Sequence, residues 1–141
     1  KFWSLWVDDM VDRQVEGVVF MFDDRSRNGG SESVDAVAGF EFLVDTIINR
    51  RYRYRRFSTR IKGKRYVPLF IWLVANKADI WWDEQASILW QQQRLREHKI
   101  FDAFRPAMIK LQKAGVVCKV SMMATRIGWN VEHSLMGMLT S

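Results

Sequence analysis

Residues 67–79 read Val-Pro-Leu-Phe-Ile-Trp-Leu-Val-Ala-Asn-Lys-Ala-Asp. The apolar first part is rich in residues that favour β-strands, and it stops abruptly at Asn76, Lys77 and Asp79. A run of this kind predicts a strand that is buried on both faces, and hence the central strand of a parallel sheet. Ligands of open α/β sheets bind beyond the carboxyl ends of the strands. The three polar residues therefore mark the expected position of a binding site.

The segments on either side predict the rest of an α/β domain. Residues 15–23 and 116–122 are further apolar runs of strand length, and helices are expected at residues 1–12, 31–50, 83–96, 101–114 and 131–139. Ser31 and Asp83 are suitable N-caps, and Gly115 is a suitable helix terminator. Strands that alternate with helices are typical of parallel sheets with right-handed crossovers. The 141 residues therefore predict one α/β domain around three parallel strands.

The overall composition is that of an ordinary globular protein, with 48% hydrophobic and 27% charged residues. Cys118 is the only cysteine, so no internal disulfide can form, which favours a reducing compartment. The longest apolar run, residues 69–75, is far shorter than the ~20 residues that span a bilayer. No N-terminal signal pattern is present. We therefore expect a cytoplasmic protein without a transmembrane segment.

The positive charge is concentrated in one basic insert, residues 50–65, which we expect to be a loop. It holds nine of the 22 basic residues and no acidic residue, and without it the chain would carry 13 basic and 16 acidic residues, a net charge of −3. Tyr52, Tyr54 and Phe57 are interleaved with the arginines. This composition suits an acidic protein partner, RNA or an anionic membrane. The alternative is a solvated loop between a helix and a strand.

Two segments of the chain resemble nucleotide-binding motifs of the Ras-like small GTPases. Asn76-Lys77-Ala78-Asp79 is similar to their Asn-Lys-x-Asp guanine-recognition motif. The segment after the third strand resembles their Ser-Ala-Lys-type loop and the Gly and Asn-Val that follow it; here it reads Met123-Ala124-Thr125-Arg126-Ile127-Gly128-Trp129-Asn130-Val131. Met123 and Thr125 replace the family's Ser and Lys, and the loop has one extra residue.

The resemblance extends upstream. Phe2-Trp3-Ser4-Leu5-Trp6, followed by residues 17–23, looks like the segment after the Asp-x-x-Gly motif in Arf-like GTPases. The resemblance therefore covers nearly the whole chain but only the later part of that domain, and the basic insert is outside the shared pattern. It implies a three-layer α/β/α sheet of the P-loop NTPase type that lacks its N-terminal phosphate-loop segment.

The resemblance also implies a role for each site residue. Guanine has two donors on its Watson–Crick edge, N1–H and the 2-amino group, and the Asp79 carboxylate can accept from both. Adenine offers no such pair, so its binding would leave a carboxylate unpaired. Asn76 is expected to bond the other edge of the base and to brace a neighbouring loop, and the Lys77 stem to cover the purine ring. The alternative is a solvated turn, where Asn and Asp are common.

In the second loop, residues Met123, Ala124 and Thr125, a backbone N–H is expected to meet the guanine oxygen. A backbone donor is unaffected by the replaced side chains, whereas the lysine that packs on the base in the family is lost. A generic strand-to-helix loop is the alternative for this segment.

The phosphate-binding motifs are absent from the chain. A phosphate loop needs Gly-x-x-x-x-Gly-Lys-Ser/Thr, and the only Gly-Lys pair, Gly63-Lys64, is followed by Arg65 and preceded at the required offset by Ser58. The switch-one threonine and the Asp-x-x-Gly motif are absent as well. We therefore expect GTP or GDP to be recognised through the base. Mg²⁺ binding and GTP hydrolysis would need an upstream phosphate-loop segment, and the chain itself holds no catalytic residue.

Two other functions remain open: a pseudo-GTPase that serves as a protein-interaction module, and an RNA- or membrane-binding protein that acts through its basic insert. A protein effector or regulator is expected both for a guanine-nucleotide-binding domain and for a pseudo-GTPase. Asp23 and Asp24 end a strand, where acids are most often turn residues. His98 and His133 lack Cys or His partners at metal-ligand spacing, and Cys118 is expected to be buried and inert. Trp81 and Trp82 either cover the base or pack under the next helix.

Overall fold

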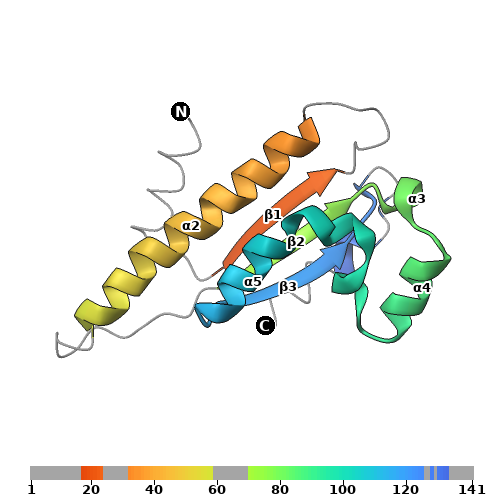
Figure 1. Cartoon of the computed structure of the whole chain (residues 1–141). Coiled ribbons are helices and arrows are strands. Elements are labelled where there is room, and N and C mark those ends of the chain that lie inside the picture. The colour runs from red at the N-terminus through yellow and green to blue at the C-terminus, as the bar shows by residue number, and fades with distance from the viewer. Residues whose placement is uncertain (1–16, 24–31, 59–69, 126–127, 129, 134–141) are drawn as a thin grey trace.

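A computed structural model describes residues 17–23, 32–58, 70–125, 128 and 130–133. Three parallel strands form a sheet in the order β1-β2-β3, with β2 in the centre (Figure 1). In chain order the elements are β1 (Gly17–Asp23), α2 (Glu32–Ser58), β2 (Phe70–Asn76), α3 (Ala78–Trp81), α4 (Glu84–Gln91), the 3-10 helices η2 (Leu95–Glu97) and η3 (Lys99–Phe104), α5 (Arg105–Lys113) and β3 (Val117–Met122). The predicted α/β class and the central, parallel place of β2 are confirmed.

The register brings the carboxyl ends of the three strands to one edge of the sheet. Asp23, the last residue of β1, lies opposite Asn76, the last residue of β2. Ala75 lies opposite Met122, the last residue of β3. The polar residues that follow the three strands therefore start from neighbouring positions.

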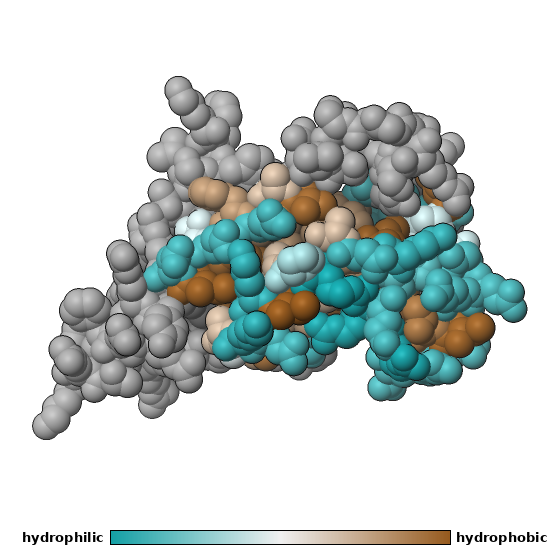
Figure 2. All heavy atoms as spheres, in the orientation of Figure 1, coloured by the Kyte–Doolittle hydropathy of each residue, from teal (hydrophilic) through white to brown (hydrophobic). Residues whose placement is uncertain are grey.

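Helices α2 and α5 cover one face of the sheet, where the main core lies (Figure 1). Strand β1 alternates exposed and buried residues, so only one of its faces meets these helices. Four α2 residues at helical spacing pack onto it: Phe40, Leu43, Val44 and Ile47. The aromatic rings pack closely, with Phe20 and Phe40 centroids 5.2 Å apart. On the side of the molecule seen in Figure 2 hydrophilic residues cover much of the described surface, and hydrophobic residues are exposed between them in several places.

The helix predicted at residues 31–50 presents the apolar residues Val34, Val37, Ala38, Phe42, Ile47 and Ile48, and not all of them face the core. Ala38 is exposed and Phe42 is 43% exposed. Phe42 lies two positions after Phe40, about 200° around the helix, so the two side chains cannot face the same way. The packing of Phe40 against the sheet decides which of them is buried.

The opposite face of the sheet carries a smaller cluster of Trp72, Val74 and Met123, against which Val131 packs. Gly17 is needed beside it, because a Cβ there would lie 2.8 Å from the Trp72 ring. A three-layer arrangement stays a prediction, since the helices expected at residues 1–12 and 131–139 lie largely outside the described residues. Only residues 131–133, which are helical, are described.

Several helix boundaries differ from the prediction. Helix α2 continues to Ser58, so residues 50–58 are helical and the loop predicted there begins no earlier than residue 59; residues 59–65 lie outside the described part. Helix α4 ends at Gln91 rather than near residue 96, because Gln93 takes a left-handed conformation with φ 58°. The turn lets Leu95 enter the core, where it is 4% exposed.

Other predicted helix signals are confirmed. Asp83 caps α4 by accepting from the Ala86 N–H, and α5 carries Pro106 in its first turn. Gly115 follows α5 with φ 76°, the left-handed conformation that ends many helices. Ser31 and the strand residues 15–16 and 67–69 lie outside the described residues. None of the described helices is long and apolar enough to cross a membrane.

Candidate functional site

The turn after β2 has a distinctive backbone conformation. Lys77 is left-handed, with φ 56° and ψ 39°, and it forms the N-cap of the one-turn helix α3. Its carbonyl accepts from the Ile80 N–H at 2.9 Å. Left-handed backbone is unfavourable for a residue with a Cβ, so the surrounding contacts must hold it. The turn places Asp79 in the first turn of α3, where it is exposed.

Backbone hydrogen bonds join this turn to the loop after β3. The Met123 N–H donates to the Ala75 carbonyl at 3.0 Å, and the Ala78 N–H donates to the Met123 carbonyl at 3.1 Å. These bonds extend the pairing of β2 and β3 beyond the strand ends. Because Ala78 and Ala124 are fully buried and Met123 is 2% exposed, the two loops are packed together as well as bonded.

The Asn76 side chain adds a second link between the two loops. Its Nδ2 donates to Thr125 Oγ1 at 3.1 Å, and its Oδ1 accepts from the Thr125 N–H at 3.2 Å. Asn76 thus braces the loop, as predicted for this residue. Both amide atoms are engaged in this contact.

Lys77 reaches towards β1. Its Nζ lies 3.4 Å from an Asp23 carboxylate oxygen, and the two side chains are 41% and 27% exposed. An exposed pair of this kind contributes at most about 1 kcal/mol to stability, so its main effect is on position. The ammonium is held over the carboxyl end of β1. Asp23, which the sequence marked only as a strand-end acid, is therefore part of this edge.

The structure brings five of the predicted site residues together at the carboxyl edge of the sheet: Asn76, Lys77, Met123, Ala124 and Thr125. Asp79 belongs to the same turn but faces solvent. Among the described residues none donates a hydrogen bond to its carboxylate. No described residue therefore occupies either of its two oxygens, which leaves this part of the chain with both acceptors for a ligand.

Trp81 holds the backbone of the turn after β2. Its Nε1–H donates to the Asn76 carbonyl at 2.8 Å, and the side chain is 5% exposed. The ring also packs against those of Trp82 and His98, at centroid distances of 5.6 and 5.4 Å. The packing role considered for Trp81 is therefore the one observed. Only its position after the motif hinted at this contact, and the sequence did not identify the bond to Asn76.

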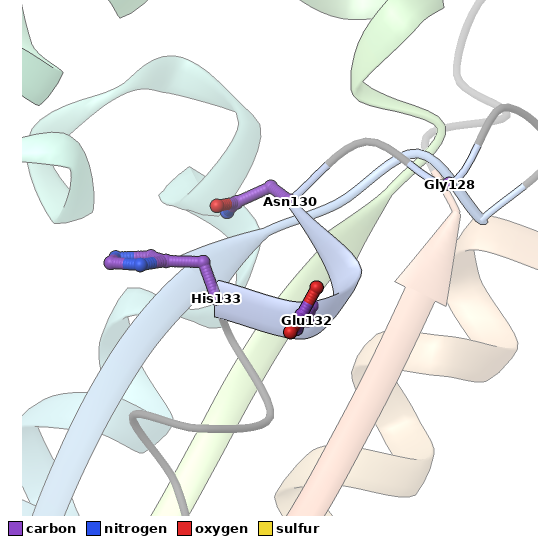
Figure 3. A pocket seen from close by; sticks show the side chains of 4 residues that line it. All are labelled: Gly128, Asn130, Glu132 and His133. Carbon is purple, nitrogen blue, oxygen red and sulfur yellow. The ribbon is translucent and has the colours of Figure 1, made fainter.

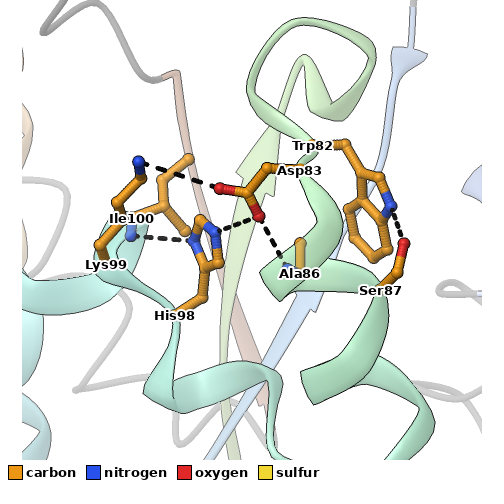
Figure 4. A network of polar contacts seen from close by, with 7 residues as sticks. All are labelled: Trp82, Asp83, Ala86, Ser87, His98, Lys99 and Ile100. Atoms are coloured by element: carbon orange, nitrogen blue, oxygen red, sulfur yellow. Dashed lines mark hydrogen bonds and ion pairs between the residues drawn. The ribbon is translucent and has the colours of Figure 1, made fainter.

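A polar network next to the turn joins α4 to η3 (Figure 4). His98 is 1% exposed; its Nδ1 accepts from the Ile100 N–H at 3.1 Å, and its Nε2 lies 3.0 Å from Asp83 Oδ1. Since Nδ1 accepts, Nε2 carries the proton and donates to the carboxylate. Lys99 lies 3.8 Å from the other Asp83 oxygen. Both ring nitrogens are occupied, so His98 has a structural rather than a catalytic position.

The same network shifts the pKa of Asp83. Burial acts to raise it, but the hydrogen bonds from Ala86 and His98 and the nearby charge of Lys99 outweigh burial. The pKa of Asp83 is therefore held below its ordinary value, and the carboxylate stays charged at neutral pH.

The start of the last helical turn is anchored by Asn130. Its Nδ2 donates to the Met122 carbonyl at 2.7 Å, and its φ is 60°. Gly128, Asn130, Glu132 and His133 line an open hollow of about 460 Å³ (Figure 3). No group of three His, Cys, Asp or Glu within the described ranges is arranged to hold a metal ion. The described residues of the hollow therefore give it polar walls but no ligand set for a metal.

Comparison with protein-family models, with curated proteins and with solved structures gives no match for this chain.

Proposed function

We propose that this chain forms the base-recognition part of a guanine-nucleotide-binding domain of the Ras-like, Arf-like type. The observation that carries the proposal is the joined pair of loops at the carboxyl edge of the sheet, Asn76-Lys77-Ala78-Asp79 and Met123-Ala124-Thr125. The parallel order of β1, β2 and β3 supports it, since ligands of such sheets bind at this edge. On this proposal the sheet belongs to a three-layer P-loop NTPase fold.

Asp79 is the residue that would select guanine. Its exposed carboxylate can accept from N1–H and from the 2-amino group in one bidentate contact, and it has no donor among the described residues. Adenine has no pair of donors there and would leave the carboxylate unpaired. A hydrogen bond to a charged group contributes about 1.5–3 kcal/mol, so the preference should be at least tenfold.

The other contacts to the base are assigned from the N–H groups and side chains that are already hydrogen-bonded within the two loops. The Met123 N–H and the Thr125 N–H are bonded to Ala75 and Asn76, so we assign the guanine oxygen to the Ala124 N–H, which the loop must uncover because Ala124 is fully buried in this structure. Lys77 would pack its stem along the purine ring, with its ammonium held by Asp23. Asn76 is committed to Thr125, so its role is to brace the second loop rather than to select the base.

The test is a titration of the chain with GDP and ADP, followed by the amide NMR signals. Both ligands carry the same phosphates and ribose, so a difference between them reports on the base alone. We expect GDP to bind at least tenfold more tightly, with shifts that centre on residues 76–80 and 123–125. Equal affinities, or shifts confined to other residues, would overturn the proposal.

A matched pair of variants locates the contact. Asp79→Ala should remove the preference for GDP, whereas Glu84→Ala, which deletes another exposed carboxylate at the start of the next helix, should keep it. If both variants retain the preference, the base is read elsewhere. If the parent chain binds neither GDP nor ADP, the proposal fails and the fold serves as an interaction module without nucleotide.

A further inference from the structure

The basic residues 50–58 continue helix α2, and we name this segment the basic arm. It carries five arginines and no acidic residue: Arg50, Arg51, Arg53, Arg55 and Arg56. Arginine has a high helix propensity, and no Gly or Pro interrupts the chain between Phe40 and Lys62. The arginines are therefore carried at regular helical positions rather than on a loop.

The lengths of the elements place the basic arm beyond the sheet. Helix α2 has 27 residues, about 40 Å, whereas β1 has 7 residues, about 23 Å. The helix begins near the carboxyl end of β1 and runs back along it, and its last turns pass the start of the strand (Figure 1). Among the α2 side chains whose burial the structure describes, Ile47 is the last that is fully buried, Ile48 is partly buried and Asn49 is exposed. The basic arm follows Asn49 directly in the sequence.

The positions of the arginines and aromatic residues around the helix distinguish between possible anionic partners. At 100° per residue the five arginines leave no sector wider than about 100° without a positive charge. Tyr54 and Phe57 share one side, but Tyr52 lies about 140–160° away from them. A helix that lies on a membrane needs a broad continuous apolar face, which this sequence does not provide. Charge on all sides suits a partner that surrounds the helix.

We propose that the basic arm binds nucleic acid through the phosphate backbone, with the helix in a groove of a duplex. Guanidinium groups bind phosphates in bidentate geometry, and the major groove of a B-form duplex admits a helix between two phosphate rows, so that arginines on several sides are used. Lys113, an exposed residue in the last turn of α5, adds positive charge just before the start of β3, at the same end of the sheet. The chemistry is that of a phosphodiester backbone, in RNA or DNA.

The basic arm and the candidate nucleotide site lie at opposite ends of the sheet. The arm extends past the amino ends of the strands, whereas Asp23, Asn76 and Met123 follow their carboxyl ends. This inference therefore does not depend on the proposed guanine site, and both ligands can bind at once.

Fluorescence anisotropy with a labelled RNA duplex, a DNA duplex of the same sequence and the single RNA strand tests the proposal. If all five arginines contact phosphates, affinity should fall roughly 500-fold between about 50 and 200 mM salt, a log–log slope of about −4.5. The double variant R53Q/R56Q should reduce that slope by about 2, and R53K/R56K should restore it. Preference for the RNA duplex would assign RNA, and equal binding of both duplexes would assign any duplex backbone.

The double variant R96Q/K99Q is the matched control, because it removes the same charge from exposed positions near η2 and η3 and should leave the slope unchanged. Gln and Arg have similar helix propensities, so far-UV circular dichroism should show equal helix content in R53Q/R56Q. An equal loss in both double variants would overturn the proposal. The proposal would also be overturned if the chain bound neither duplex but bound vesicles of phosphatidylserine and phosphatidylcholine through the same arginines.

Discussion

Asn76 and Thr125, 49 positions apart in the sequence, are joined by three hydrogen bonds: the asparagine Nδ2 donates to Thr125 Oγ1, and its Oδ1 accepts from the Thr125 N–H and hydroxyl. The contact joins the turn after β2 to the loop after β3. The Trp81 indole donates to the Asn76 carbonyl and so holds the backbone of the same residue. Asn76 is thus the point at which the two candidate base-binding loops are held in register.

Replacing Asn76 by alanine should loosen the second loop more than it destabilises the fold. The Thr125 N–H would lose its acceptor, so its hydrogen exchange should become faster, while unfolding in urea should show a loss of only about 1 kcal/mol because the contact is exposed. Thr125→Ser keeps the hydroxyl and the N–H and should behave like the parent chain. An unchanged exchange rate at Thr125 in the alanine variant would show that the bonds do not restrain the loop.

Asp79→Asn should move the base preference from guanine to xanthine. The substitution turns one of the two acceptor positions into an amide donor, and xanthine carries an oxygen at C2 where guanine carries an amino group. Titrations with GDP and xanthosine diphosphate should therefore cross over, with the variant favouring the xanthine nucleotide by tenfold or more. Glu84→Gln is the control for a lost surface charge. A variant that still favours GDP would rule out the role assigned to Asp79.

The sequence predicted the sheet because the strand signals are local. Residues 70–75 are apolar without interruption, which requires cover on both faces, and this identified β2 as the central strand. The connections between strands are long enough for crossovers, so parallel pairing followed from general rules. The position of Asn76 and Thr125 at one edge then follows from strand direction alone.

The basic segment shows where that reasoning failed. A charge run without apolar periodicity predicts a loop, whereas α2 continues through it to Ser58. The usable signal was the absence of Gly and Pro between Phe40 and Lys62, together with the helix propensity of arginine. Likewise, the sequence could not choose between Phe40 and Phe42 for the core, since only packing against β1 separates two candidate stripes.

Details of the site depended on side-chain direction. The lysine of the Lys77–Asp23 ion pair is left-handed, and the tryptophan of the Trp81–Asn76 bond lies in the short helix α3, which the sequence did not predict. Neither conformation has a residue signature here, because left-handed turns are usually marked by Gly or Asn.

Replacing Asp83 by alanine should destabilise the fold by about 2–4 kcal/mol. It removes the N-cap of α4, worth about 1 kcal/mol, and leaves the donor of buried His98 unpaired, which costs about 1–3 kcal/mol. Asp83→Asn keeps an acceptor oxygen and should cost much less at pH 7. Urea unfolding measures both, and equal losses in the two variants would contradict this account of the network.

The pH dependence of the Asp83 contribution has a defined direction. Because the pKa of Asp83 is below its ordinary value in the folded chain, the contribution is complete above that ordinary value of 3.8 and disappears as the pH falls through the lower folded value. The amide that replaces the carboxyl group in Asp83→Asn does not titrate. The stability difference between the parent and this variant should therefore shrink in acid, below about pH 4, and a constant difference would exclude the shift.

Cys118 should react slowly with thiol reagents in the folded chain. Burial in β3 raises its pKa from 9.0 to about 11, although Arg96 opposes this in part. At pH 8 roughly 0.1% of the thiol would be ionised, against about 10% at the ordinary value, so labelling should be roughly 100-fold slower than after unfolding in urea. The raised pKa also means that folding favours the neutral thiol. Stability should thus fall as the pH rises from about 9 towards 11, and Cys118→Ala should remove that part of the decline. A labelling rate that levels off below pH 9.5 would show instead that Cys118 is not shielded by the core.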